Sequence, residues 1–119
     1  MNRVRFIDHN ERQILYLDFS SCEVDQAFEV MKEAKNTVKN QAENSLRVLT
    51  DVTDAKFNTA LTDAMKEFAA HNKPYVKASA VIGVTGIKKI IYDAILLFSK
   101  RHIATFNNAE SAKAWLTQD

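Results

Sequence analysis

The last third of the chain places apolar and polar segments in an order that few folds accommodate. An apolar segment at 75–84 ends just before Gly86, and a helical pattern that begins with two lysines follows at 86–99. A short apolar segment at 102–106 comes next, and Asn108 then precedes a final helical pattern. The order strand, helix, strand, helix indicates parallel strands joined by helical crossovers, and therefore an α/β protein.

The first part of the chain supplies three more strands and two more helices. Alternating apolar residues predict strands at 3–8 and 13–19 that form a hairpin, and a further strand at 45–53. Apolar residues spaced three and four apart predict helices at 24–38 and 58–71. The resulting order, β-β-α-β-α-β-α-β-α, predicts one mixed five-stranded sheet covered by four helices.

The apolar pattern also predicts which residues form the core and how many domains the chain contains. The residues that we expect to be largely buried are Leu15, Leu17, Leu46, Val48, Ala80, Ile82 and Trp115. Two glycines and one proline leave no room for a flexible linker, so residues 1–119 are expected to form a single domain.

Charge, cysteine content and hydropathy narrow the classes of function. With 16 basic and 15 acidic side chains the net charge is +1, so no overall field attracts nucleic acid. Cys22 is the sole cysteine, and no Cys/His spacing resembles a metal site, so we expect no disulfide, metal or cofactor. The chain begins without the apolar core of a signal peptide, and no apolar run approaches the roughly 18 residues that span a bilayer. A cytoplasmic protein without an integral membrane segment is therefore expected.

Four segments carry a resemblance to a known family. They are ILYLDFS at 14–20, SLRVLTDVTDAKF at 45–57, VKASAVIGV at 76–84 and IATFNNAESAKAWL at 103–116. In these segments and in its order of elements, the chain resembles the SpoIIAA-like branch of the STAS family (sulfate-transporter and anti-sigma-antagonist domains). It is similar there to bacterial proteins described as STAS/CRAL-TRIO-like. The resemblance covers nearly the whole chain. It implies a non-enzymatic cytoplasmic regulatory module that binds a protein partner or a small anionic or lipidic ligand.

One feature of that family is missing. Sporulation-type antagonists carry a phosphorylatable serine in an Asp-Ser-Ser-Gly-like turn, where the helix after the third strand begins. The matching residues 54–59 read DAKFNT, with neither serine nor glycine, and Thr59 is the nearest hydroxyl. We therefore expect no phosphorylation switch at these residues.

A candidate anion site lies where the third helix begins. Thr85, Gly86, Lys88 and Lys89 occupy this position. The first amide groups of a helix lack intrahelical partners and lie at the positive end of its dipole, so they can hold a phosphate or carboxylate. In this interpretation Thr85 donates its hydroxyl and the lysines add charge. The alternative is structural, with Thr85 capping the helix and Gly86 permitting a tight turn.

Asp18 and Asp51 form a second candidate site, because each lies near the end of a strand. Ligands collect at the carboxyl ends of parallel strands, where two carboxylates could act as acid and base in a small enzyme. The alternative is that each aspartate caps nearby backbone amides. No nucleophile, metal triad or glycine-rich loop accompanies the pair, which favours the capping interpretation.

The helical pattern at 86–99 is apolar around much of its circumference. The residues expected to form its core-facing stripe are Ile87, Ile90, Ile91, Ala94, Ile95 and Phe98. Tyr92, Leu96 and Leu97 extend the apolar surface beyond that stripe, and such a helix needs a second partner. We expect these three residues to form the interface of a symmetric homodimer. The alternatives are a lipid or membrane surface, as in a lipid-binding protein of CRAL-TRIO type, and a second contact inside the domain.

Overall fold

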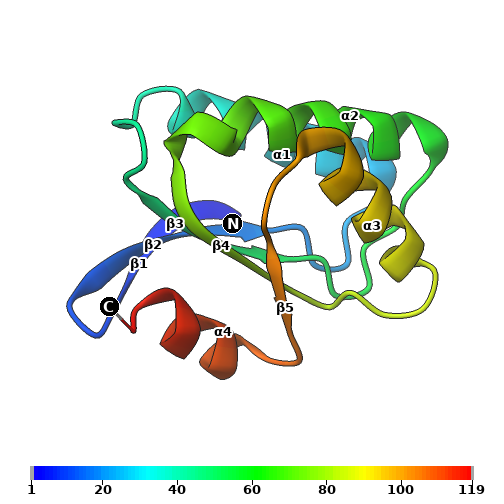
Figure 1. The fold of residues 1–119 in the computed structure, drawn as a ribbon. Helices are drawn as coiled ribbons and strands as arrows, with labels where there is room; N and C mark the ends of the chain where they lie inside the picture. The colour runs from blue at the N-terminus through cyan, green and yellow to red at the C-terminus, as the bar shows by residue number, and fades with distance from the viewer. Residues whose placement is uncertain (1, 119) are drawn as a thin grey trace.

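The computed structural model describes residues 2–118 and consists of one five-stranded sheet with four α-helices (Figure 1). Its elements are β1 (Val4–His9), β2 (Arg12–Asp18), α1 (Val24–Val38), β3 (Leu46–Asp51), α2 (Thr59–Asn72), the 3-10 helix η1 (Lys73–Tyr75), β4 (Val76–Ile82), α3 (Lys88–Ser99), β5 (Ala104–Phe106) and α4 (Ala109–Leu116). The strands lie side by side in chain order. β1 pairs with β2 antiparallel, and all later pairs are parallel. The predicted α/β class and mixed sheet are thereby confirmed.

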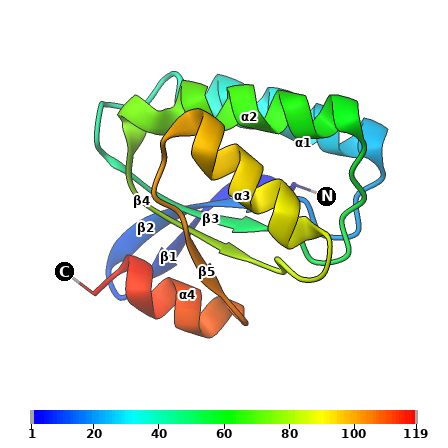
Figure 2. The ribbon, with the colours of Figure 1, turned by 45° about the vertical axis from the view of Figure 1, so that its right-hand side comes forward.

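The α-helices are divided unequally between the two faces of the sheet. Figures 1 and 2 show α1, α2 and α3 above the sheet and α4 below it. Strand order explains this division. Each crossover moves one strand further in the same direction, and crossovers of one handedness therefore place their helices on the same face. The chain reaches the other face only after the last strand, where α4 packs against β3, β4 and β5.

Two helices begin where the sequence supplies an asparagine cap. The Asn58 side chain accepts a hydrogen bond from the amide of Leu61 at 2.8 Å, and α2 starts at the next residue. Asn108 accepts one from the amide of Ser111 at 2.9 Å and starts α4 in the same way. Each asparagine satisfies an amide that the helix itself leaves unpaired. Pro74 lies in η1, which turns the chain from α2 into β4.

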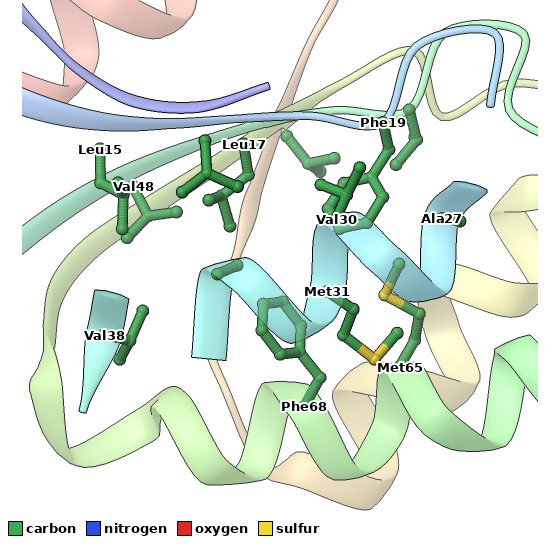
Figure 3. Packing of buried hydrophobic residues seen from close by; sticks show 14 of the residues in the cluster. Leu15, Leu17, Phe19, Ala27, Val30, Met31, Val38, Val48, Met65 and Phe68 are labelled. Atoms are coloured by element: carbon green, nitrogen blue, oxygen red, sulfur yellow. The ribbon is translucent and has the colours of Figure 1, made fainter. Parts of the chain in front are cut away.

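The core has one layer on each side of the sheet. Leu15, Leu17 and Val48 point toward α1 and α2, where Figure 3 shows them facing Met31 and Phe68. Alternate strand residues point the other way, and Ile14, Leu49, Ala80 and Ile82 pack with α4. This alternation is the period-two geometry of strands whose two faces are both covered.

The expected core residues are buried with one exception, Trp115. Leu15, Leu17, Leu46, Val48, Ala80 and Ile82 are all buried. Trp115 is more exposed than these six but still packs against the core. Its ring packs against Phe106 with centroids 5.6 Å apart. Phe106 belongs to β5, a short edge strand of three residues, and so little sheet remains there to cover the indole.

The helix α3 is rotated relative to the predicted stripe. Ile87, Ile90 and Phe98 were expected in the core, but they are 74%, 70% and 49% exposed. Ile95 packs against the core as expected, and Tyr92, which was not expected there, packs against it too. Polar tips account for this rotation: Tyr92 donates its hydroxyl to the Ile103 carbonyl, and Lys88 Nζ donates to the Val52 carbonyl at 2.9 Å. Both side chains thus cross the helix–sheet interface with their polar atoms satisfied.

Candidate functional site

A cavity of about 100 Å³ lies between α2, α3 and the sheet face formed by β3 and β4. Its walls are mainly aliphatic and aromatic, with side chains from both helices and both strands. Two of the side chains that face it are small: Ala69 on α2 and Ser79 on β4, both buried. Larger residues at these two positions would fill the space between helix and sheet.

The charged side chains in the cavity wall are both positive. Lys88 and Arg101 supply two cations, and none of the described residues that line the cavity is an aspartate or glutamate. Asn72 and Ser79 add a buried amide and a buried hydroxyl, each 3% exposed. The cavity therefore combines an apolar wall with hydrogen-bond donors and positive charge.

The two cations differ in what they bind within the protein. Lys88 Nζ donates to the Val52 carbonyl, as described above, so its polar atom already has an acceptor. The backbone amide of Arg101 donates to Ser99 Oγ at 3.3 Å. Across residues 2–118, however, no side-chain hydrogen bond or ion pair engages the Arg101 guanidinium. Arg101 is the cation of the cavity without an internal partner.

The surroundings of Arg101 are apolar enough to affect its ionisation. Loss of hydration on burial lowers the pKa of Arg101 from its ordinary 12.5 to about 10. This value is still far above neutral pH, so the guanidinium stays charged. A charged group that is desolvated without a counter-charge is energetically unfavourable, and such groups are concentrated at functional sites.

The predicted anion site is divided by the fold. Thr85, Gly86 and Lys89 are exposed, whereas Lys88 is half-buried and faces the cavity. The amides of Lys88 and Lys89 each donate at 3.1 Å, to the carbonyls of Thr85 and Gly86 respectively. These contacts occupy amides that the interpretation assigned to a ligand. An anion site at this helix start stays a prediction.

Asp18 and Asp51 lie side by side, as their strand-end positions suggested. They are direct partners in the register of β2 and β3. Asp18 Oδ1 accepts hydrogen bonds from the amide and hydroxyl of Ser20, at 2.9 and 2.5 Å, and lies 3.5 Å from Arg3 Nη1. Asp51 Oδ1 accepts from the amide of Thr53 at 2.9 Å. Each carboxylate thus holds the turn that follows its strand, which is the capping role.

A tyrosine completes the aspartate cluster and shows which face it occupies. Tyr16 donates its hydroxyl to Asp51 Oδ2 at 3.3 Å. Its ring packs against the core layer between the sheet and α4. Burial, and then the negative charges of Asp51 and Asp18, raise the pKa of Tyr16 to about 12. The phenol therefore remains protonated at neutral pH. This cluster lies on the α4 face, and the cavity lies on the opposite face.

The residues predicted for a dimer interface do not share one surface. Tyr92 faces the cavity and Leu96 is half-buried, while Leu97 is 82% exposed. The exposed apolar surface of α3 and the turn before it consists of Ile87, Ile90, Leu97 and Phe98. We call these four residues the outer face of α3.

Sequence reasoning missed Arg101, Asn72 and Ser79 as site residues. The signal available for Arg101 was the charge imbalance of residues 73–102, which hold six basic residues and the single acid Asp93. Asn72 and Ser79 carry no such signal, because buried amides and hydroxyls resemble ordinary polar residues in a sequence.

These features define a small α/β protein with an apolar, positively charged cavity between two helices and the sheet. The chain belongs to the family described as Domain of unknown function (DUF7793), whose model matches residues 9–118. Neither the curated proteins nor the solved structures include a match to the chain. None of the helices formed by residues 2–118 has the length and apolarity that crossing a bilayer requires.

Proposed function

We propose that this protein is a non-enzymatic, cytoplasmic ligand-binding module of a regulatory kind that takes a small apolar molecule into the cavity between α2 and α3. The cavity itself is the observation that carries the proposal. The resemblance to STAS domains points to the same class of function. The aspartate pair supports an enzyme less well, because both carboxylates are used to hold turns.

The size of the cavity favours a small ligand over a long lipid. An engineered cavity of about 150 Å³ with apolar walls takes up benzene. At about 100 Å³, the cavity here is smaller and suits a short alkyl chain of about four carbons. A carrier of long acyl chains, the CRAL-TRIO alternative, needs a larger enclosure. A bound ligand would touch α2, α3 and the sheet together, so that binding could alter the position of α3.

The test uses 1-butanol as a neutral probe in an NMR titration of the ¹⁵N-labelled protein. We expect saturable shifts at Ala69, Tyr92 and Ile103, which line the cavity. In Ala69→Leu the added side chain occupies the cavity, so these shifts should disappear while the protein remains folded. Ala60→Leu is the matched control, since Ala60 lies on the same helix but is exposed, and it should bind as the wild type does. An unchanged titration in Ala69→Leu would contradict the proposal.

We also propose a homodimer that forms through the outer face of α3. Four large apolar side chains between 49% and 82% exposed form this face, and contiguous surfaces of this kind mark contact sites. Leu97 belongs to this surface, as the sequence suggested, whereas Tyr92 does not. Ile90, which lies about one helical turn before the middle of α3, belongs to this surface in place of Tyr92.

Light scattering at tens of micromolar protein tests the dimer. We expect the wild type to show twice the monomer mass and Leu97→Glu to show the monomer mass, because a charge would be buried in the contact. Ala60→Glu, which adds the same charge to an exposed site on α2, should leave the dimer intact. A monomeric wild type would refute this proposal without affecting the cavity.

A further inference from the structure

We infer that Arg101 is the anion receptor of the cavity, and that the ligand is a small apolar monocarboxylate whose head group pairs with this guanidinium. The inference rests on the proposed function, because it specifies the chemical class of molecule that the cavity takes. It assigns the head group to the end of the cavity opposite the predicted anion site.

The topology gathers donors at one end of the cavity. Asn72 ends α2, and Arg101 follows α3 by two residues. Both therefore lie at the end where β4 and β5 begin, since these helices run antiparallel to the strands that they precede. Figure 2 shows the loop from α3 to β5 close to the end of α2 from which β4 descends. Lys88, at the start of α3, lies toward the other end.

Arg101 supplies a positive charge that no other side chain of the described residues neutralises. Its guanidinium has no hydrogen-bond or ion-pair partner within residues 2–118, and none of those that line the cavity is a carboxylate. Arg101 is partly buried, and a partly desolvated cation is less favourable unpaired than when an anion pairs with it in good geometry. The planar fork of a guanidinium matches the two oxygens of a carboxylate.

The charge at this end of the cavity selects the head group. Lys88 donates to the Val52 carbonyl and lies toward the other end, so Arg101 is the cation beside the gathered donors. A single carboxylate neutralises it. A phosphate monoester carries a charge of about −1.5 to −2 at neutral pH, which exceeds the single positive charge at this end. The remaining walls accept the alkyl chain of the same ligand.

The experiment compares butyrate with 1-butanol, which share a four-carbon skeleton and differ in the charged group. In the wild type, butyrate should bind at least about tenfold more tightly, since hydrogen bonds to charged groups are the stronger ones. In Arg101→Met this preference should vanish, while the affinity for 1-butanol stays within about twofold because the apolar walls are retained. Lys73→Met removes the same charge from an exposed position outside the cavity and should preserve the preference.

The outcomes separate this inference from the proposed function. If neither probe binds, the proposed function fails and the inference fails with it. If both probes bind equally to the wild type, or if Arg101→Met keeps the preference, only the inference is overturned. A preference that is lost in Lys88→Met and kept in Arg101→Met would place the head group at the other end and would also overturn it.

Thermal unfolding of the ligand-free protein supplies a second readout. Arg101→Met should raise the Tm, because methionine replaces an unpaired charge in an apolar setting with a side chain suited to it. Butyrate should raise the Tm of the wild type and leave that of Arg101→Met unchanged. A lower Tm in ligand-free Arg101→Met would assign Arg101 a structural role and overturn the inference.

Discussion

Replacement of Gly83 by alanine is expected to lower the free energy of unfolding by about 3 kcal/mol, the combined cost of overpacking and backbone strain. Gly83 joins β4 to the turn before α3 and has φ +89°, a conformation that residues with a side chain rarely adopt. A Cβ atom there would lie 2.4 Å from the backbone nitrogen of Thr53. The added Cβ would clash with a backbone atom, which cannot rotate away as a side chain can. The clash is therefore relieved only if the segments after β3 and β4 move apart.

Gly86→Ala is the matched control for this prediction. Gly86 also has a positive φ, +58°, but no atom lies within 4 Å of the position that a Cβ would take. Only the left-handed conformation is penalised, so we expect a loss of about 1 kcal/mol. Urea unfolding of the wild type and both variants measures the difference. Equal losses in the two variants would show that close approach to Thr53 is not what requires glycine at position 83.

Leu17→Ala is expected to cost about 2–5 kcal/mol, the range for removing a buried leucine side chain and leaving a cavity. Leu17 is 1% exposed and lies on β2, between antiparallel β1 and parallel β3, facing the α1 and α2 layer (Figure 3). Its neighbours belong to both strands and helices. Because these elements are packed against one another, they cannot shift to fill the cavity that alanine would leave. The lost contacts and the remaining cavity therefore add together.

Leu97→Ala deletes the same atoms from a residue that is 82% exposed. We expect a change below about 0.5 kcal/mol in the monomer, as is usual for surface substitutions. Denaturant unfolding at several protein concentrations measures both variants. A loss in Leu97→Ala that grows with concentration would support the α3 dimer, whereas a loss below 1 kcal/mol in Leu17→Ala would contradict the core described above.

Local sequence signals predicted the elements and their order well. Asn58 and Asn108 mark helix starts because a side-chain oxygen satisfies an amide three residues later, an interaction that needs no distant residue. Strand alternation predicted the burial of Leu15 and Leu17, which pack in one core layer. The side-by-side placement of Asp18 and Asp51 followed from parallel strands that end at the same edge.

The errors arose where a residue had more than one suitable environment. Ile90 and Phe98 fit a core-facing stripe by spacing, but α3 turns Lys88 and Tyr92 inward instead. The deciding contacts are with the carbonyls of Val52 and Ile103, which belong to other elements. Helical periodicity describes the separation of residues around one helix and carries no information about acceptors elsewhere.

The sequence by itself determined the α/β class, the order of strands and helices, and most of the core, because each depends on the periodicity and capping of neighbouring residues. Long-range contacts set which face of α3 turns inward and where the cavity lies, and they leave Arg101 without an acidic neighbour in the cavity wall formed by residues 2–118. Those properties depend on residues from α2, β4 and the α3–β5 loop, which lie far apart in the chain. A charge is paired or unpaired according to what surrounds it in space, and the folding of the whole domain decides those surroundings.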